Sequence, residues 1–227
     1  MIIAIDGPAG SGKSTISKLV AKDLNLIYLD TGAMYRMFTL KLLNEKVSFE
    51  DKKKIEELLQ NLNINIDKES FFLDGKDVSE EIRKSNVSQN VSKVAAIKEV
   101  REKMVDLQRK FSQSKDVILD GRDIGTVVFP NANIKIYLVA DLKERAERRY
   151  REMLEKGQKV SFEEIYKNIA DRDKLDSTRE ITPLKKAADA VEVDTTAKSI
   201  EEVKKEILNI YKIQQVNKKI WKIKNYI

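Results

Sequence analysis

The first residues of the chain place a short apolar segment directly before a glycine-rich segment of fixed spacing. Residues 2–6 are apolar up to Asp6, and residues 7–14 then read Gly-Pro-Ala-Gly-Ser-Gly-Lys-Ser, which fits the pattern G-x-x-x-x-G-K-[ST]. Residues 13–24 continue with a helical pattern. A strand, a glycine loop and a helix in this order form the context that a phosphate-binding P-loop requires. We therefore expect the chain to bind a nucleoside triphosphate.

Within this loop, each type of residue suits contact with phosphate. The glycines allow a tight turn in which backbone N–H groups point toward an anion, and the following helix adds the positive end of its dipole. Lys13 can reach the terminal phosphates, and the Ser14 hydroxyl can ligate Mg²⁺. The predicted ATP-binding residues are Gly7, Pro8, Ala9, Gly10, Ser11, Gly12, Lys13, Ser14 and Thr15.

Composition restricts the chemistry that is available. A chain of 227 residues suits one domain. It contains no Cys and no His, so thiolate metal sites and the usual general base are excluded, and Asp, Glu, Lys, Arg and Mg²⁺ must carry the chemistry. No apolar run approaches the length of a membrane span, and Asp6 interrupts the first apolar segment too early for a signal peptide. We expect a cytoplasmic protein, and nothing in the sequence requires more than a monomer.

The net charge is +6, but it is the small difference between 43 basic and 37 acidic residues. A protein that handles polyanionic nucleotides needs local positive charge in any case. We therefore expect neither a nucleic-acid nor a membrane partner, and we expect the partners to be small-molecule nucleotides.

Strand-like and helix-like segments alternate along the chain. Continuous apolar runs predict strands at residues 2–6, 26–30, 117–120, 134–139 and 191–194. Helical patterns occupy residues 13–24, 33–44, roughly 91–111, 142–155, 162–173 and 200–211. Five strands separated by helices predict an α/β fold with a parallel sheet that is covered on both faces.

Two segments depart from this alternation. Residues 64–78 alternate between polar and apolar side chains around Asp74-Gly75, which predicts a small antiparallel β insert, with a long surface loop as the alternative. Residues 212–227 form a basic amphipathic helix pattern. We expect this tail to pack on its own domain, with a partner or membrane-surface helix as the alternative. Its apolar residues are Ile213, Val216, Ile220, Ile223 and Ile227, and its lysines are Lys212, Lys218, Lys219, Lys222 and Lys224.

Arginines gather at strand ends and on later helices, where ligands bind open α/β sheets. Any single one of them is more often a surface ion pair than a functional group, but the whole set suits an anionic ligand. The set consists of Arg36, Arg122, Arg145, Arg148, Arg149, Arg172 and Arg179.

With these motifs in place, the chain resembles bacterial-type cytidylate kinases over about residues 1–211. The resemblance rests on residues 5–14, on Leu-Asp-Thr-Gly-Ala-Met-Tyr-Arg at 29–36, on Asp-Gly-Arg-Asp-Ile-Gly-Thr-Val-Val-Phe-Pro at 120–130, and on residues 172–179 and 187–190. Adenylate and guanylate kinases share the P-loop but not this set. The resemblance implies a P-loop kinase fold, namely a five-stranded parallel sheet flanked by helices. It also implies an antiparallel insert in the monophosphate-binding region at about 60–90 and a helical lid at about 145–162. The tail at 212–227 lies outside the resemblance.

The resemblance also implies residue roles. Ser92, Arg101 and Asp123 would read the cytosine base, and Arg36 and Arg122 would hold the acceptor phosphate. Thr31, Arg172, Asp176 and Arg179 would form the ribose pocket, where Thr31 stands in place of a serine found in other members. The implied catalytic residues are Lys13, Arg122, Arg145, Arg148 and Arg149, and the implied metal ligands are Ser14 and, through a water, Asp120.

The implied reaction is ATP + CMP ⇌ ADP + CDP, with dCMP as a further acceptor, in pyrimidine nucleotide metabolism. It would proceed by in-line phosphoryl transfer with Mg²⁺ bound to ATP. Two alternatives remain at this point. One is a P-loop ATPase that uses nucleotide as a switch, and the other is a kinase for a different small acceptor, such as UMP or shikimate.

Overall fold

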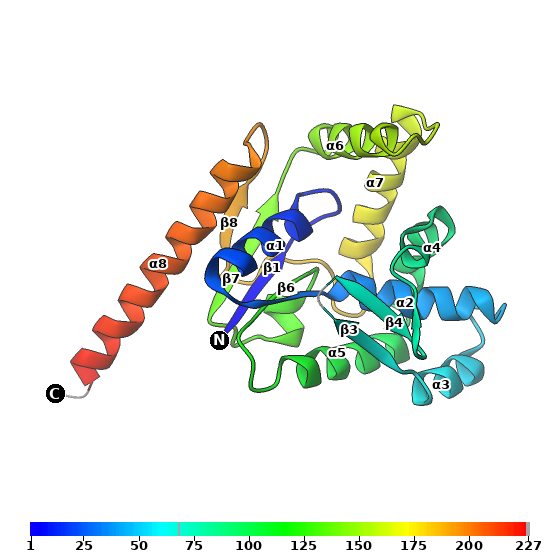
Figure 1. Cartoon of the computed structure of the whole chain (residues 1–227), viewed down its shortest axis with the longest axis horizontal. Coiled ribbons are helices and arrows are strands. Elements are labelled where there is room, and N and C mark those ends of the chain that lie inside the picture. Colours follow the sequence, from blue (N-terminus) through cyan, green and yellow to red (C-terminus); the bar gives the residue numbers. More distant parts are fainter. Residues whose placement is uncertain (68, 226–227) are drawn as a thin grey trace.

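The computed structural model describes residues 1–67 and 69–225, with side chains described as far as residue 217. A five-stranded sheet of order β2-β6-β1-β7-β8 forms its centre (Figure 1). All neighbouring strands pair in parallel, which confirms the expected α/β architecture. The strands are β1 (Ile2–Asp6), β2 (Ile27–Asp30), β6 (Val117–Gly121), β7 (Ile134–Val139) and β8 (Val191–Asp194).

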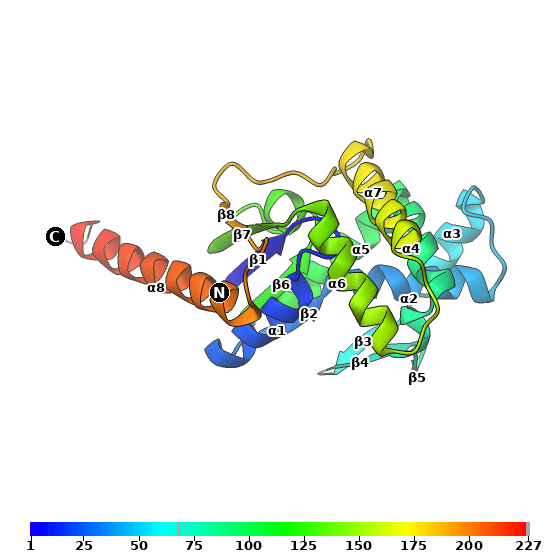
Figure 2. The same cartoon turned by 90° about the horizontal axis from the view of Figure 1, so that it is seen from above.

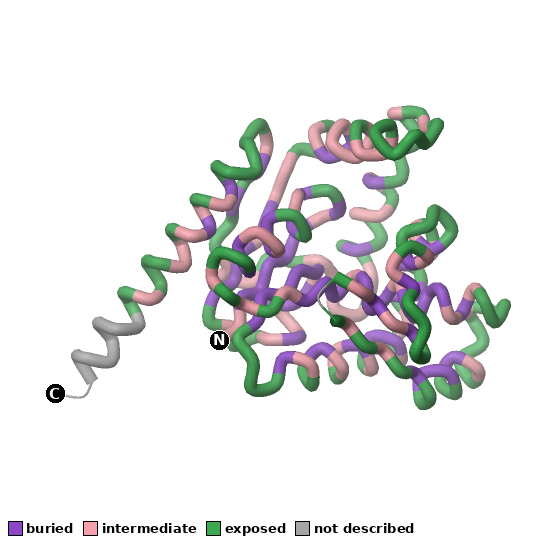
Figure 3. Tube along the Cα trace, viewed as in Figure 1, coloured by how far each residue is buried: buried purple, intermediate pink, exposed green. Residues whose placement is uncertain are grey.

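Successive residues of the central strands point to opposite faces, and both faces are buried (Figure 3). Ile3 and Ile5 pack in one core with the helices α1 and α8, whereas Ala4 packs in the other core with α2 to α5. This explains why the strands are continuously apolar rather than alternating. The helices are α1 (Lys13–Leu24), α2 (Thr31–Asn44), α3 (Lys52–Gln60), α4 (Ser85–Ala96), α5 (Lys98–Ser112) and α8 (Ile200–Asn225).

The predicted β insert is present as a second sheet of order β3-β4-β5, formed by Ile64–Asp67, Ser70–Leu73 and Lys76–Asp77. Both strand pairs are antiparallel. Asp74 and Gly75 connect β4 to β5 with φ angles of 49° and 83°, the paired positive values of a tight hairpin turn. The antiparallel pairing rules out the alternative of a long surface loop.

The helices between residues 52 and 112 differ from the sequence-based expectation. The single helix expected at roughly 91–111 is two helices, α4 and α5, which are separated at Ile97. Ile97 has extended backbone angles (φ −71°, ψ 126°), and the freed carbonyl of Ala95 accepts a hydrogen bond from Arg101 Nη1 at 3.0 Å. No Gly or Pro marks this break, so the local sequence gives no signal for it. Helix α3 was not expected.

Helices α6 (Leu142–Glu155) and α7 (Phe162–Thr178) pack against each other around a small core of their own. Ala146, Ile165 and Ile169 form its buried part. Figures 1 and 2 both place this helix pair beside the loop that follows β1. Helix α7 continues five residues past its expected end at 173, so that Asp176 lies within the helix.

Helix α8 continues well beyond residue 211 and extends away from the sheet in both views (Figures 1 and 2). Val203 and Ile207 are buried, but Ile213 and Val216 are 59% and 54% exposed. The expected packing of the tail on its own domain is therefore wrong for these two side chains. Ile220, Ile223, Ile227 and the lysines from Lys218 onward lie outside the described side chains. Among the described residues, no helix is long and apolar enough to cross a bilayer.

The glycine at the end of β1 generates a stability prediction. Gly7 has φ +151°, and a Cβ atom there would collide with the backbone oxygen of Leu138 in β7. Gly12 also has a positive φ, +87°, but a Cβ atom there meets nothing within 4 Å. Gly7→Ala should therefore lower the free energy of unfolding by more than Gly12→Ala, for which we expect the strain cost of about 1–2 kcal/mol. Urea unfolding of both variants measures this difference, and equal losses would contradict the role assigned to the close strand contact.

Candidate functional site

The carboxyl ends of the parallel strands bring distant segments together at one edge of the sheet. Asp6 at the end of β1 lies in register with Gly121 of β6, and Asp30 at the end of β2 lies in register with Asp120. Open α/β sheets bind ligands at this edge. The Asp6 carboxylate accepts hydrogen bonds from the backbone N–H groups of Ile124 and Gly125 at 2.8 and 2.7 Å. These bonds fix the segment after β6 next to the P-loop.

The P-loop wraps around the side chain of its own lysine. Helix α1 begins at Lys13, directly after the left-handed Gly12. Lys13 Nζ donates hydrogen bonds to Pro8 O at 2.6 Å and to Ser11 Oγ at 3.3 Å. Burial and the nearby Arg122 hold the pKa of Lys13 well below its usual value. Positive charge is thus concentrated where the motif predicts a triphosphate.

Ser14 and Asp120 meet beside this loop. Ser14 Oγ donates a hydrogen bond to Asp120 Oδ2 at 2.6 Å, and Tyr28 Oη donates one to Asp120 Oδ1 at 2.8 Å. Burial and the neighbouring Asp30 raise the pKa of Asp120 to about 6. A hydroxyl and a carboxylate oxygen are the hard ligands that Mg²⁺ prefers. No group of three or more acidic residues that could hold a metal occurs in the described part of the chain. This sparse donor set fits Mg²⁺, which takes few protein ligands and completes its shell with phosphate and water.

Three arginines lie close together across the same edge of the sheet. Arg122 Nε donates a hydrogen bond to Asp176 Oδ2 at 2.8 Å, and Arg172 Nε lies 4.0 Å from the same oxygen. Burial, followed by the repulsion of Arg122 and Arg36, lowers the pKa of Arg172 to about 9. Burial also lowers the pKa of Arg36, and no ion pair with Arg36 within 4.0 Å is found among the described residues. Despite burial, Asp176 raises the pKa of Arg122, whereas the pKa values of Arg36 and Arg172 remain lowered.

Two arginine N–H groups of this region are buried without a hydrogen-bond partner in the described structure, namely Nε of Arg172 and Nη2 of Arg179. Leaving a buried charged donor unpaired costs free energy of about 1–3 kcal/mol or more. An anionic ligand between these arginines would supply the missing acceptors. The geometry and the lowered pKa values point to the same kind of ligand.

Arg101 and Asp123 form a buried ion pair next to this cluster. Arg101 Nη2 donates to Asp123 Oδ2, and Arg179 Nη2 lies 4.0 Å from Asp123 Oδ1. The Arg101 guanidinium lies 5.6 Å from the ring centre of Tyr35, and its Nε has no partner among the described residues. Ser92 is half-buried on α4, and no hydrogen bond to its side chain is found in the described part of the chain.

Thr31 and the arginines of α6 differ in what they contact. The Thr31 hydroxyl donates to Asp120 O at 2.7 Å and is buried at the start of α2. Arg145 contacts the P-loop, since its Nη1 donates to Ala9 O at 2.9 Å. Arg148 donates to Thr195 O at 2.6 Å, and Arg149 pairs with Glu152 on its own helix. The three arginines thus share one helix but have three different sets of partners.

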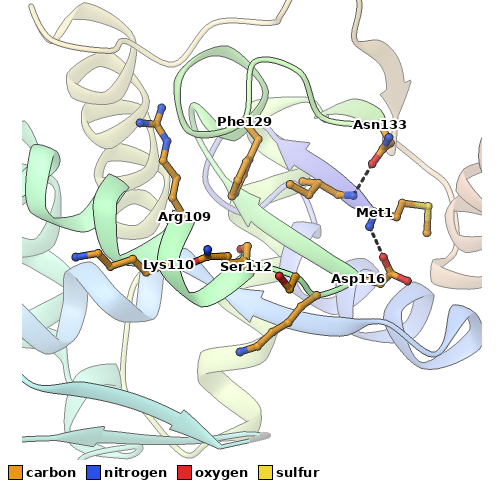
Figure 4. Close-up of a pocket in the computed structure, with 11 residues that line it drawn as sticks. Met1, Arg109, Lys110, Ser112, Asp116, Phe129 and Asn133 are labelled. Atoms are coloured by element: carbon orange, nitrogen blue, oxygen red, sulfur yellow. Dashed lines mark hydrogen bonds and ion pairs between the residues drawn. The ribbon is translucent and has the colours of Figure 1, made fainter.

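A separate surface hollow of about 560 Å³ lies at the opposite end of the sheet, where β1, β6 and β7 begin (Figure 4). Arg109 donates to the carbonyls of Val127 and Val128, Lys110 pairs with Asp106, and Lys115 Nζ lies 4.2 Å from the ring centre of Phe111. None of the sequence-predicted site residues lines this hollow. The candidate site is therefore the carboxyl edge of the sheet.

Sequence reasoning did not identify Tyr28, Asp6 or Asp173 as site residues. Tyr28 and Asp6 each lie within a predicted strand, and their roles depend on partners that are more than ninety residues away. Asp173 follows the predicted Arg172, and only the folded structure shows that it contacts the P-loop. Their proximity to recognised motifs was the only signal available in the sequence.

A parallel sheet with a glycine loop after its central strand and a helix that begins at the motif lysine defines a P-loop nucleotide-binding protein. Residues 3–213 match the model of the cytidylate kinase family. The cytidylate kinase of Fusobacterium nucleatum is 54% identical over 224 residues, which cover 99% of this chain and 99% of that protein. The cytidylate kinase of Alkaliphilus oremlandii is 53% identical over 210 residues, covering 92% and 97%. The chain belongs to the cytidylate kinase family, as the motifs predicted.

The solved structures add a likeness in fold alone. An uncharacterized protein from Eubacterium ventriosum has a TM-score of 0.50 at 15% sequence identity, with 92% of this chain and 97% of that chain covered. The family match ends at residue 213, so the last part of α8 lies beyond it.

The buried carboxyl of Asp6 generates a pH prediction. Burial raises its pKa to about 6 despite two backbone hydrogen bonds, whereas an aspartate in an unfolded chain titrates near about 4. Between these values the native state holds a proton that the unfolded state has released, so the free energy of unfolding should fall as the pH rises through this window. Asp6→Asn, which does not titrate, should flatten that slope. Urea unfolding at about pH 4.5 and about pH 6.5 checks this, and an unchanged slope would show that Asp6 does not titrate there.

Proposed function

We propose that this chain transfers the terminal phosphoryl group of ATP to the phosphate of CMP, and also of dCMP. A phosphate oxygen of the acceptor forms a bond to the γ-phosphorus while the bond from that phosphorus to the bridging oxygen of the β-phosphate breaks. The products are CDP or dCDP and ADP. One observation carries the proposal, namely the cluster of Arg36, Arg122 and Arg172 at the same sheet edge as Lys13, in which the buried Nε of Arg172 has no hydrogen-bond partner in the described structure. Membership of the cytidylate kinase family supports it.

In this proposal, Arg36 and Arg122 hold the acceptor phosphate. A guanidinium presents two parallel N–H groups that suit phosphate oxygens, which makes arginine better suited than lysine for this role. The unpaired N–H groups of Arg172 and Arg179 would donate hydrogen bonds to oxygen atoms of the bound nucleotide. Arg172, Arg179 and Asp176, together with Thr31, would surround the ribose. The Thr31 hydroxyl already donates to Asp120 O, so its oxygen remains available to accept from a ribose hydroxyl.

The base would be read by Asp123, Arg101 and Ser92. Cytosine presents an amino donor beside a ring-nitrogen acceptor and a carbonyl acceptor. The Asp123 carboxylate can accept from the amino group, and the arginine and serine can donate to the acceptors. Uracil reverses donor and acceptor at two of these positions and would leave buried polar groups unpaired. Sites that hydrogen-bond one substrate in this way can favour it over an analogue by about 10⁴-fold or more in kcat/KM.

Catalysis in this proposal needs no histidine. The acceptor phosphate is already largely ionised at neutral pH, so alignment and positive charge carry the reaction. Lys13 supplies charge at the P-loop, and Arg145, Arg148 and Arg149 extend from the lid helix α6. Ser14 and Asp120 would hold the Mg²⁺ of the ATP complex, Asp120 through a water. When bound, this ion neutralises charge on the phosphate oxygens. We place this reaction of free nucleotides in the cytoplasm and propose a monomer as its unit.

A coupled assay of ADP release tests the function. With Mg²⁺ and ATP present, turnover should be high with CMP and dCMP, lower with UMP, and negligible with AMP or without an acceptor. Lys13→Ala should abolish this turnover, whereas Lys22→Ala, which removes an exposed lysine from the same helix, should retain it. ATP consumption that does not require a monophosphate would contradict the proposal and favour a nucleotide switch. Preference for a different small acceptor would overturn the assignment of CMP.

The role of Asp123 can be tested separately from ATP binding. Asp123→Asn keeps the size of the side chain but replaces one acceptor oxygen with a donor, so kcat/KM for CMP should fall by about 10- to 100-fold, equivalent to about 1–3 kcal/mol. The affinity for ADP should change by less than about twofold. The melting temperature reports any loss of the Arg101 ion pair, and Asp106→Asn on α5 serves as an exposed control. Equal losses for CMP and ADP would show that Asp123 serves the fold and not the base.

A further inference from the structure

Asp173 joins helix α7 to the P-loop. Its Oδ1 accepts a hydrogen bond from the backbone N–H of Ala9 at 3.2 Å, and its Oδ2 accepts one from Arg145 Nη1. Arg145 Nη1 also donates to Ala9 O at 2.9 Å. The N–H and the carbonyl of a single P-loop residue are therefore both bonded to one partly buried ion pair.

The two members of this ion pair come from two helices that pack against each other, α6 in the expected lid and α7 after it. Arg145 lies on α6 and Asp173 lies on α7, and the pair is sheltered, with side chains 7% and 21% exposed. Because α6 and α7 share a small core of their own, they can shift together relative to the sheet. Any such shift acts on Ala9 through both of its polar backbone groups.

The same helix α7 carries residues of the proposed acceptor site. Arg172 precedes Asp173 directly, and Asp176 lies one helical turn further on. Asp176 accepts from Arg122, which brings α7 to the acceptor side of the sheet edge. One helix therefore contacts the donor loop through Asp173 and the acceptor pocket through its neighbours.

We propose that Asp173 is a positioning residue that couples acceptor binding to donor binding. An acceptor that engages Arg172 and Asp176 orders α7. Asp173 and Arg145 then hold the tip of the P-loop in the arrangement that receives the donor phosphates. Each substrate consequently tightens the binding of the other, by the same factor in both directions. The inference rests on the proposed function, because it requires a nucleoside monophosphate at the arginine cluster.

Calorimetric titration tests this coupling directly. ADP with Mg²⁺ is titrated into the full chain with and without saturating CMP, a combination that binds both halves of the site but cannot transfer phosphate. For the unmodified chain we expect CMP to lower the Kd of ADP by about 5-fold or more, within the usual range of coupling between sites. Asp173→Asn keeps an oxygen that can accept from Ala9 but loses the charge that pairs with Arg145. It should reduce the coupling to less than about twofold.

Matched controls separate this role from a structural one. Asp171→Asn removes an exposed carboxylate from the same helix and should retain full coupling. Asp173→Asn should still bind ADP alone and should melt near the temperature of the unmodified chain, since a general loss of structure would weaken the ADP titrations with and without CMP equally. The reverse titration, CMP with and without ADP, must give the same coupling factor.

The outcomes distinguish the inference from the proposed function. If both nucleotides bind and the coupling of the unmodified chain is near one, or if Asp173→Asn retains it, the inference is wrong and the proposed function stands. If ADP binds but CMP does not bind under any of these conditions, the proposed function and the inference both fail.

Discussion

Burial of several positive charges close together at one edge of a parallel sheet is the constraint on which this structure depends. Arg36, Arg122 and Arg172 lie so close together that burial and mutual repulsion lower the pKa of Arg172 to about 9, although Asp176 is adjacent. Burial and the positive charge of Arg122 also lower the pKa of Lys13. Such a cluster is costly when empty and becomes favourable when an anion occupies it.

The fold creates this cluster from segments that are far apart in sequence. Strand β1 ends at the P-loop, β2 leads through Asp30 into the helix of Arg36, and β6 ends beside Arg122. Parallel pairing forces these strand ends to one edge. The bonds from Asp6 to the segment after β6, and from Tyr28 and Ser14 to Asp120, then fix the ends relative to one another. On the sheet side this edge is held by these hydrogen bonds, whereas the helix pair α6 and α7 reaches it through Arg145 and Asp173.

The parallel sheet and the P-loop were predictable because their signals are local: apolar runs for buried strands, and a fixed glycine spacing followed by Lys-Ser. The β insert was also predictable, since Asp74-Gly75 is a strong turn signal. The break at Ile97 was not, because it depends on Arg101, which bonds the freed Ala95 carbonyl. The contacts of Asp173 and Tyr28 could not be predicted, because their hydrogen-bond partners are far away in the sequence. The exposure of Ile213 and Val216 could not be predicted, because an amphipathic helix pattern fits a helix that packs on its own domain and a helix that extends into solvent equally well.

The central claim is that the arginine cluster receives the acceptor phosphate, and a crystal structure of the chain with CMP bound tests it most directly. The account predicts the phosphate within hydrogen-bond distance of Arg36 and Arg122, the ribose beside Arg172, and the cytosine beside Asp123 and Arg101. Nε of Arg172, which has no hydrogen-bond partner in the described structure, should then be bonded. CMP held elsewhere, with Arg122 still bonded to Asp176 and the other arginines without a ligand, would contradict the account.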